Sequence, residues 1–371
     1  MRKFSYFLFE NFEADEHAEN PKNPRRFLNS ASDAVLSYVA DYPTGLCRYD
    51  ACVERFDVGQ VVLLIEGGIL RHEKGCIKFD SPIILREDVT ELRKKMNKAA
   101  ARLTNVLSIY LPDIRSVCSE INNGFSVEEN LYHILCGMIF DGTFFDYLEK
   151  RNSVAVSRLH PSGLDYIAVI YEKCPQLDAY SNGLLCSYNR FTDGHCALQS
   201  FGDANGERYD FYRFFRCMEA NRLSNVFHPT KELLESCYNI GKEEILLQVK
   251  SLITQGTCST YVLTLLEHFS YVKNGEICVP VFTAVHKAAI DEVAKVVETN
   301  IGEQFAVELS ELSEKLDLTA VRHGVAMGEI ANELYHILFG SVNEELVKRG
   351  FVTEPLYIPG EGRYRKSIQL I

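Results

Sequence analysis

The sequence contains no tryptophan and no hydrophobic run long enough to cross a membrane. Its longest purely aliphatic stretch, residues 61–65, is far shorter than the roughly 20 residues that span a bilayer. The first ten residues are rich in Phe, but acidic residues follow from Glu10 to Glu19 without a small-residue cleavage site. We therefore expect a soluble, cytoplasmic protein that does not act at a membrane.

Basic residues are outnumbered, because 39 Lys and Arg face 51 Asp and Glu, for a net charge of -12. A chain this acidic repels phosphate backbones unless a local basic patch overrides the field. The composition therefore disfavours nucleic acid as a general partner. The ordinary content of hydrophobic residues, 46%, excludes wholesale disorder.

No two cysteines have the two-residue gap of a zinc knuckle or a redox motif, although the chain contains 12 of them. Many lie beside apolar residues, where cysteine behaves as a small buried side chain. The best metal-ligand set is Cys174, Cys186, His195 and Cys196, but its gaps are irregular and its adjacent His-Cys pair suits one tetrahedral ion badly. The pattern predicts reduced thiols in the core, with no metal and no cofactor.

The usual catalytic motifs are missing. There is no nucleophile elbow, phosphate loop, His-Glu-x-x-His helix or complete Gly-x-Gly-x-x-Gly. Tyrosine stands beside histidine twice, as Tyr132-His133 and Tyr335-His336, and such a pair could transfer protons. A glycine four residues after each histidine instead favours close packing against a neighbouring segment. We predict no catalytic residues, and an enzymatic role stays an alternative only.

An internal repeat is the most informative feature. Residues 127–137 and 330–340 share Leu-Tyr-His-Ile-Leu, followed two residues later by Gly. Shorter matches are collinear with this one: 62–63 with 262–263, 75–77 with 275–277, and 150–151 with 348–349, at separations that stay between 198 and 203. We infer that a unit of about 110 residues occurs twice, at about 60–172 and 260–371.

Both copies predict the same order of elements. A short apolar helix (58–66; 259–267) precedes a hairpin, whose turn is Lys74-Gly75 in one copy and Asn274-Gly275 in the other. A long polar helix follows (86–107; 284–298), then the helix with the shared segment, in which Leu131, Ile134, Leu135 and Met138 form one apolar stripe. Each copy ends in an extended pair broken near 161–163 or 359–362. The fold class is therefore α+β.

Two segments differ from the repeated units. Residues 173–227 are rich in turn signals and aromatic residues, and 184–188, 196–201 and 209–215 are predicted as strands or short mixed segments. Their side chains Tyr209, Tyr212 and Phe214 are candidates for contact with a flat ligand, although a core role is favoured. Residues 1–30 are predicted as an arm whose acidic run is a solvated segment rather than a mimic of nucleic acid.

From Asp33 onward, the first unit resembles the winged helix-turn-helix domains of bacterial transcription regulators. Residues 34–40, 49–56 and 60–67 match the three helices, with turns at 42–46 and 57–59, and residues 69–79 match the wing. In the second unit, 244–253, 261–268 and the Asn274-Gly275 turn follow the same plan. The chain is thus divided into an arm (1–30), a first winged-helix-like unit (31–172), a β-rich insert (173–227) and a second winged-helix-like unit (228–371). The resemblance implies that the two units together form a fused pseudo-dimer.

The helix that would read DNA departs from that family. A major-groove reader presents Arg, Lys, Asn, Gln or Ser, whereas residues 58–67 offer Gln60 alone and residues 258–267 have no cation. A helix that is apolar all round belongs in a core or against a partner. We expect six apolar side chains of these helices to be mostly buried: Val62, Leu63, Ile65, Val262, Leu263 and Leu266.

Basic residues near the first wing and the following helix are the only candidates for contact with nucleic acid: Arg71, Lys74, Arg93, Lys94, Lys98 and Arg102. The matching helix of the second unit carries Asp291, Glu292 and Glu298 instead. Any nucleic acid would therefore contact the first unit. The leading hypothesis is a non-enzymatic regulatory protein with protein partners. The alternatives are a DNA-binding regulator, and a ligand-binding protein or enzyme with a pocket between the units or in the aromatic insert.

Overall fold

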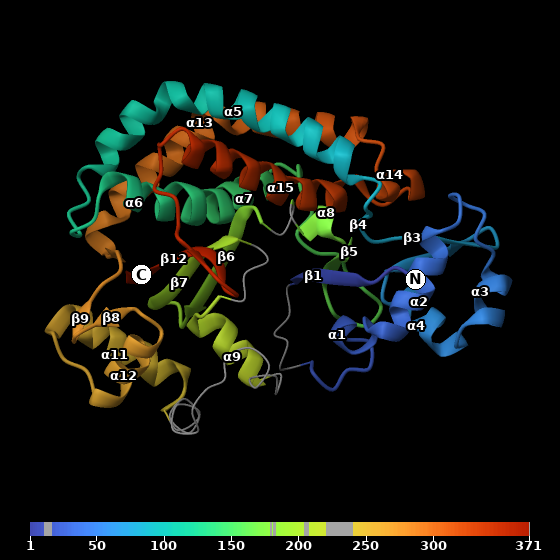
Figure 1. Cartoon of the computed structure of the whole chain (residues 1–371), viewed down its shortest axis with the longest axis horizontal. Coiled ribbons are helices and arrows are strands. Elements are labelled where there is room, and N and C mark those ends of the chain that lie inside the picture. Colours follow the sequence, from blue (N-terminus) through green and yellow to red (C-terminus); the bar gives the residue numbers. More distant parts are fainter. Residues whose placement is uncertain (11–16, 179, 181–182, 204–207, 220–239, 371) are drawn as a thin grey trace. The chain divides into compact units, whose positions relative to one another are not determined.

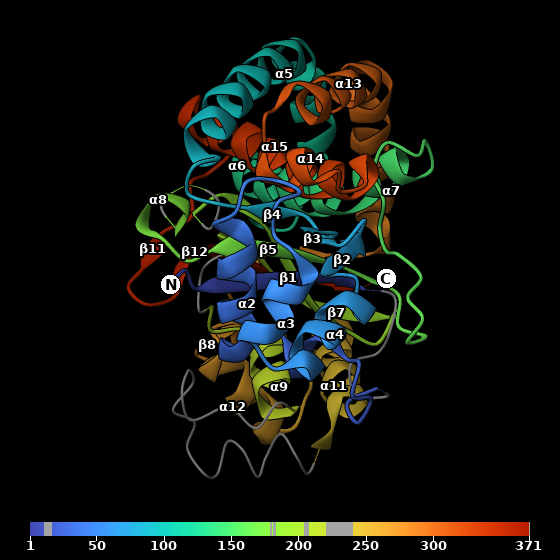
Figure 2. The same ribbon diagram turned by 90° about the vertical axis from the view of Figure 1, so that its right-hand side faces the viewer.

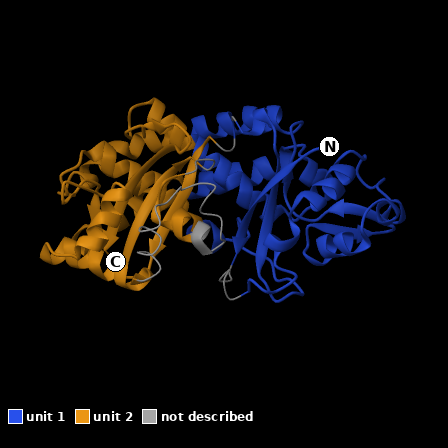
Figure 3. Cartoon of the chain, turned by 60° about the horizontal axis from the view of Figure 1, so that its bottom comes forward, with its two compact units in different colours: residues 1–103, 146–182, 302–341 blue, residues 104–145, 183–301, 342–371 orange. Residues whose placement is uncertain are grey.

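The chain forms two compact units in the computed structural model, which describes residues 1–10, 17–178, 180, 183–203, 208–219 and 240–370. Unit 1 comprises residues 1–103, 146–182 and 302–341, and unit 2 comprises 104–145, 183–301 and 342–371 (Figure 3). Both contain helices and strands, which agrees with the predicted α+β class. No helix in the described part of the chain is long and apolar enough to cross a membrane.

Unit 1 contains a three-stranded sheet, a group of helices followed by a two-stranded hairpin, and several further helices (Figure 1). Its complete elements are β1 (Phe4–Glu10), α1 (Pro24–Phe27), α2 (Ser30–Ala40), α3 (Tyr49–Arg55), α4 (Val58–Glu66), β2 (Leu70–Glu73), β3 (Cys76–Phe79), β4 (Ile83–Ile84), β5 (Tyr166–Glu172), α8 (Pro175–Asp178) and α14 (Thr319–His323). It shares α5 (Val89–Cys118), α7 (Phe144–Glu149), α13 (Lys287–Lys315) and α15 (Met327–Lys348) with unit 2.

Unit 2 contains a larger sheet and a second hairpin that follows two helices. Its complete elements are α6 (Val127–Leu131), the π-helix η1 (Tyr132–Thr143), β6 (Leu185–Thr192), β7 (Cys196–Asp203), α9 (Phe211–Glu219), α11 (Lys242–Gln255), α12 (Thr260–His268), β8 (Val272–Lys273), β9 (Glu276–Ile277), β10 (Val281–Phe282), the short 3₁₀ helix η3 (Ala284–His286), β11 (Tyr357–Ile358) and β12 (Gly362–Leu370).

The two sheets pair their strands in the same way. In unit 1, β5 runs antiparallel to β1 and parallel to β4, with Ile83 opposite Ile170. In unit 2, β12 runs antiparallel to β7 and parallel to β10, with Val281 opposite Ile368. β6 adds a further antiparallel strand beside β7. The order helix, hairpin, short parallel strand, long helix and long strand is therefore common to both sequence halves.

The hairpin turns also adopt one conformation. Lys74 and Gly75 have φ values of 53° and 78°, and Asn274 and Gly275 have 54° and 80°. Two successive residues with positive φ are the mark of a type I′ turn, whose twist matches that of the strands it joins. The turn predictions are confirmed at both places.

Each sheet is covered by a helix that carries Leu-Tyr-His-Ile-Leu from the other sequence half. In unit 1, α15 lies on the sheet of β1 and β5: the Phe9 and His336 rings are 4.9 Å apart. In unit 2, η1 lies on β7, where the Tyr132 hydroxyl donates to the Phe201 carbonyl at 2.9 Å. A Cβ at Gly137 would lie 3.3 Å from the Phe201 ring, so this glycine permits the close approach that the sequence predicted. Figure 2 shows these helices from a second direction.

Two local expectations are wrong. Residues Phe4–Glu10 are not an arm but a strand, because they pair along their whole length with β5, whose residues are all buried. Residues 211–215 belong to helix α9 rather than a strand. Phe211, Phe214 and Phe215 fall at i, i+3 and i+4 and are all buried, so helical periodicity outweighs the β-propensity of aromatic residues. Most of the acidic run, residues 11–16, lies outside the described residues.

Candidate functional site

The outward face of α4 is apolar and has no cation. Val61 and Leu64 are its buried residues, Val58 is 54% exposed, and Val62 and Leu63 are half-buried. The Gln60 amide, which is the side chain best suited to read a base, donates to the Phe27 carbonyl at 3.2 Å. The helix therefore ties its polar side chain to Phe27 and leaves Val58 as its exposed apolar side chain.

The matching helix α12 has a more polar outward face, again without Lys or Arg. Val262, Leu265 and Leu266 are buried, whereas Tyr261 is 39% exposed and Thr264 is exposed. The burial prediction is thus confirmed for Val262 and Leu266. It holds less fully for Val62, Leu63, Ile65 and Leu263, which are half-buried rather than exposed.

Half of the basic candidates are already engaged. Arg71 donates to the Asp80 carboxylate at 3.0 Å and to the Gly324 carbonyl at 3.2 Å. Arg102 makes two hydrogen bonds of 2.5 Å to the Glu308 carboxylate. The Arg93 guanidinium lies 5.7 Å from the centre of the Tyr180 ring. Lys74, Lys94 and Lys98 are exposed, and so is Arg93 despite its ring contact, so four of the six candidates can reach a phosphate backbone.

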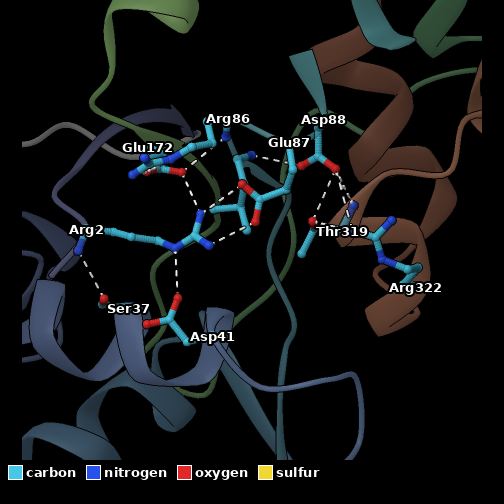
Figure 4. Close-up of polar contacts among 10 residues, drawn as sticks. Arg2, Ser37, Asp41, Arg86, Glu87, Asp88, Glu172, Thr319 and Arg322 are labelled. Atoms are coloured by element: carbon cyan, nitrogen blue, oxygen red, sulfur yellow. Dashed lines mark hydrogen bonds and ion pairs between the residues drawn. The ribbon is translucent and has the colours of Figure 1, made fainter. Parts of the chain in front are cut away.

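Three carboxylates surround Arg2 and tie the N-terminal strand to its neighbours (Figure 4). The Arg2 guanidinium lies 3.1 Å from Asp41, 2.9 Å from Glu87 and 2.7 Å from Glu172. The Glu172 side chain, which has no exposed surface, also accepts hydrogen bonds from Arg86. Burial raises the pKa of Glu172, but the hydrogen bonds from Arg86 and Arg2 outweigh it and hold that pKa below its usual value. Every group is partnered, so this network is structural.

Two buried glutamates of α15 titrate unusually in unit 1. Burial raises the pKa of Glu329 to about 7, although its carboxylate lies 3.3 Å from the Arg158 Nε. Burial likewise raises the pKa of Glu333 to about 7, and the opposing hydrogen bond from the Tyr171 hydroxyl does not restore it. Near neutral pH both carboxyl groups are therefore close to half-protonated. The cause is burial, which disfavours the charged form more than the neighbouring groups stabilise it.

Replacing Glu333 by Gln should make the protein more stable at alkaline pH. The folded-state pKa lies above the unfolded one, so the wild type loses stability as pH rises from about 4.5 to 7, and a neutral amide escapes that loss. Relative to wild type, the free energy of unfolding of E333Q should increase by about 2–3 kcal/mol between pH 5 and pH 8. Urea unfolding of both proteins at both pH values measures this change. If the free-energy difference between E333Q and wild type is the same at pH 5 and pH 8, Glu333 is ionised in the folded protein at both pH values.

A cavity of about 360 Å³ opens in unit 2, between β12, the residues on either side of the β8–β9 hairpin, and the region of α6 and η1. Its wall includes the side chains of His133, Tyr209, Val279, Ile358, Arg365 and Lys366. Arg365 donates to the Glu129 carboxylate at 3.0 Å, and its own Nε is buried without a hydrogen-bond partner. Polar and apolar groups thus meet in one concave site, as they do in ligand pockets.

Two groups in this cavity stand out chemically. Burial lowers the pKa of His133 to about 3, so its imidazole is neutral, and no hydrogen bond to it occurs within the described chain. Lys366 donates to the Phe269 carbonyl at 2.5 Å, and its ammonium lies 5.3 Å from the Tyr364 ring centre. Burial lowers the pKa of Lys366 to about 8. His133 is 2% exposed, as a core residue is expected to be, and its ring also forms part of the cavity wall.

Of the three aromatic candidates, Tyr209 lines this cavity and hydrogen-bonds His268. Tyr212 is half-buried against the core of unit 2, and Phe214 is fully buried within it. Sequence reasoning missed Lys366, although Tyr364, Lys366 and Ile368 alternate along β12 and so share one face of the sheet. A lysine at an apolar position of a strand was the available signal.

Metal binding finds no support among the residues that can be described. Within them, no three His, Cys, Asp or Glu side chains lie close enough together to hold an ion. The ten cysteines whose side chains are described are free thiols. The chain matches no family model, no curated protein and no solved structure.

Proposed function

We propose that this chain is a non-enzymatic, cytoplasmic regulatory protein, made of two winged-helix-like units that arose by internal duplication. In this proposal the face that reads DNA in winged-helix regulators contacts a protein instead. The observation that carries it is the state of α4: the Gln60 amide donates to the Phe27 carbonyl, while Val58 is exposed and Val62 and Leu63 are half-buried.

The proposed duplication is supported by strand pairing, which is independent of the residue identities from which the repeat was inferred. Ile170 N donates to the Pro82 carbonyl and Ile368 N donates to the Pro280 carbonyl, both at 2.9 Å, where the short parallel strand enters each sheet. The same register and the same type I′ turn in both halves are consistent with one ancestral unit. Two related units in one chain resemble the two subunits of a dimer. Each unit then offers one version of the same surface, and the two versions differ in sequence.

Protein contact is supported by the chemistry of the α4 face. An exposed valine beside half-buried leucine and valine has no hydrogen-bonding group for a base edge and no charge for phosphate. Apolar side chains rimmed by polar ones, here Asp57 and Glu66, are typical of protein interaction sites. The partner surface should accordingly be apolar, with basic groups at its edge.

The experiment replaces an outward residue of α4 and compares it with the same change on α12. Leu63→Glu should abolish stoichiometric binding of a partner purified with the wild-type protein, while Thr264→Glu should leave that binding unchanged. Thr264 is exposed but Leu63 is half-buried, so circular dichroism and thermal unfolding first establish that the Leu63→Glu variant is folded. If the bound partner is lost equally in both variants or in neither, α4 is not the contact surface.

DNA binding remains the second candidate, because Lys94 and Lys98 are exposed on one helix and Lys74 is exposed at the tip of the wing. On this alternative, binding is driven by phosphate contacts alone. The Lys94→Glu and Lys98→Glu double variant would then lose DNA and keep the protein partner.

A further inference from the structure

The cavity of unit 2 contains a lysine, Lys366, that makes no direct ion pair with the described residues. Lys366 lines the cavity, and no carboxylate lies within ion-pair distance of its ammonium in the described chain. Its hydrogen bond goes to a backbone carbonyl, that of Phe269. A half-buried ammonium without a counterion is costly, which is why an incoming anion would be favoured there.

The acidic groups near Lys366 are already occupied. Asp210 accepts hydrogen bonds from Asn189 and from the Ser200 hydroxyl. Glu129 accepts from Ser126 and from Arg365, and Glu361 accepts from the Tyr364 hydroxyl. None of these three carboxylates pairs directly with Lys366, and its ammonium keeps N–H donors beyond the one that bonds Phe269, so an anionic group can bind there.

The rest of the cavity suits a compact apolar body. Phe125, Val279, Pro280 and Ile358 supply apolar surface, and Tyr209 and Tyr364 supply ring faces. The His133 imidazole lies in the same wall without a hydrogen bond from the described residues and offers one donor and one acceptor when neutral. A volume of about 360 Å³ lies at the small end of the range for ligand pockets.

We propose that this cavity binds a small organic carboxylate, whose carboxylate group pairs with the Lys366 ammonium and whose apolar body lies against Val279 and Ile358. His133 then donates to, or accepts from, a polar substituent of the ligand. Ligand binding at this site does not depend on the proposed role of α4, which lies in the other unit.

Isothermal titration with phenylacetate and with hexanoate tests the proposal on the full chain. At least one probe should bind with a dissociation constant below about 1 mM, which is about −4 kcal/mol. Phenylacetamide, which lacks the charge, should bind at least tenfold more weakly. Failure of both carboxylates to bind at millimolar concentration, or equal binding of the amide, overturns the proposal.

The decisive variant is Lys366→Gln, which keeps an N–H donor for the Phe269 carbonyl but removes the charge. Affinity should fall at least tenfold, while Lys273→Met, at an exposed lysine of β8, should change nothing. His133→Gln should weaken binding of a probe with a polar ring substituent, 4-hydroxyphenylacetate, and His336→Gln should not. Unchanged affinity in a folded K366Q protein would place the carboxylate elsewhere.

The pH dependence of the wild type gives a readout that needs no variant. The ligand binds the charged lysine, so affinity should fall about tenfold between pH 7 and pH 9, with proton uptake on binding. Asp210, Glu361 and Cys278 act electrostatically on Lys366. Because the profile is assigned to Lys366, Cys278→Ser should preserve it. A flat profile contradicts the assignment of Lys366.

Discussion

Replacing Glu172 by Ala should lower the free energy of unfolding by about 3 kcal/mol, because a buried carboxylate that accepts from two arginines is removed. The Glu172 side chain has no exposed surface, while Arg2 is 17% exposed and keeps Asp41 and Glu87 as partners. The loss should therefore lie near the lower limit for breaking a buried ion pair. Urea unfolding monitored by circular dichroism measures it.

Glu87 provides the matched control, because it pairs with the same guanidinium from a position that is 44% exposed. Solvent screening should keep the cost of Glu87→Ala below about 1 kcal/mol. Equal effects of the two substitutions would mean that Arg2 is solvated and that the N-terminal strand is not held by this network. The difference between the variants should also shrink in acid, because protonation of Glu172 removes the same charge.

Truncating the shared segment should damage the protein equally in its two copies. Leu131 and Leu334 are 0% and 1% exposed, and each occupies the first position of Leu-Tyr-His-Ile-Leu. Leu131→Ala and Leu334→Ala should each cost about 2–5 kcal/mol, through lost burial and the cavity left behind. Leu247→Ala, at a leucine of α11 that is 59% exposed, should cost less than about 1 kcal/mol.

Unequal stability losses in Leu131→Ala and Leu334→Ala would show that the two shared segments pack differently. The two segments differ in backbone, because Tyr132 begins a π-helix whereas Tyr335 lies within the regular helix α15. If Leu131→Ala is tolerated while Leu334→Ala unfolds the protein, the two copies have diverged in packing, and the shared residues do not perform one structural role.

Helices and turns were predictable where the residues that determine them lie within one short segment. Helix α4 begins at Val58 and ends at Glu66, as expected from its apolar residues, and the Lys74-Gly75 and Asn274-Gly275 turns form as expected from their sequence. The burial of Leu131, Ile134, Leu135 and Met138 also follows from helical spacing. These features depend on neighbours within a few residues, which the sequence displays directly.

Long-range pairing was not predictable in this way. Strand β1 pairs with β5, so that Phe4 lies opposite Glu172, and nothing near Phe4 identifies so distant a partner. The predicted contiguous units also differ from the compact ones, since residues 302–341 belong to unit 1 and 104–145 to unit 2. A long helix can carry the chain into either unit with the same amphipathic pattern, so periodicity does not distinguish the two outcomes.

The candidate site was only partly accessible from sequence. The lack of cations on α4 and α12 could be read directly, but the inward hydrogen bond of Gln60 and the neutralisation of Arg102 by Glu308 required coordinates. The cavity brings residues near 130, 210, 280 and 360 together, a set that no short motif contains. Lys366 gains its unusual pKa, lowered to about 8, from burial that the sequence does not display.

The most direct test of the central claim is the binding of double-stranded DNA measured against salt. Fluorescence anisotropy of a labelled duplex, titrated with the full chain from 50 to 200 mM salt, reports both affinity and the number of phosphate contacts. The account predicts a dissociation constant weaker than about 100 μM with no sequence preference, because Gln60 of α4 is bonded to the Phe27 carbonyl and neither α4 nor α12 carries Lys or Arg. Sequence-selective binding tighter than about 100 nM, with a log–log slope steeper than about −3 that Leu63→Glu abolishes, would contradict it.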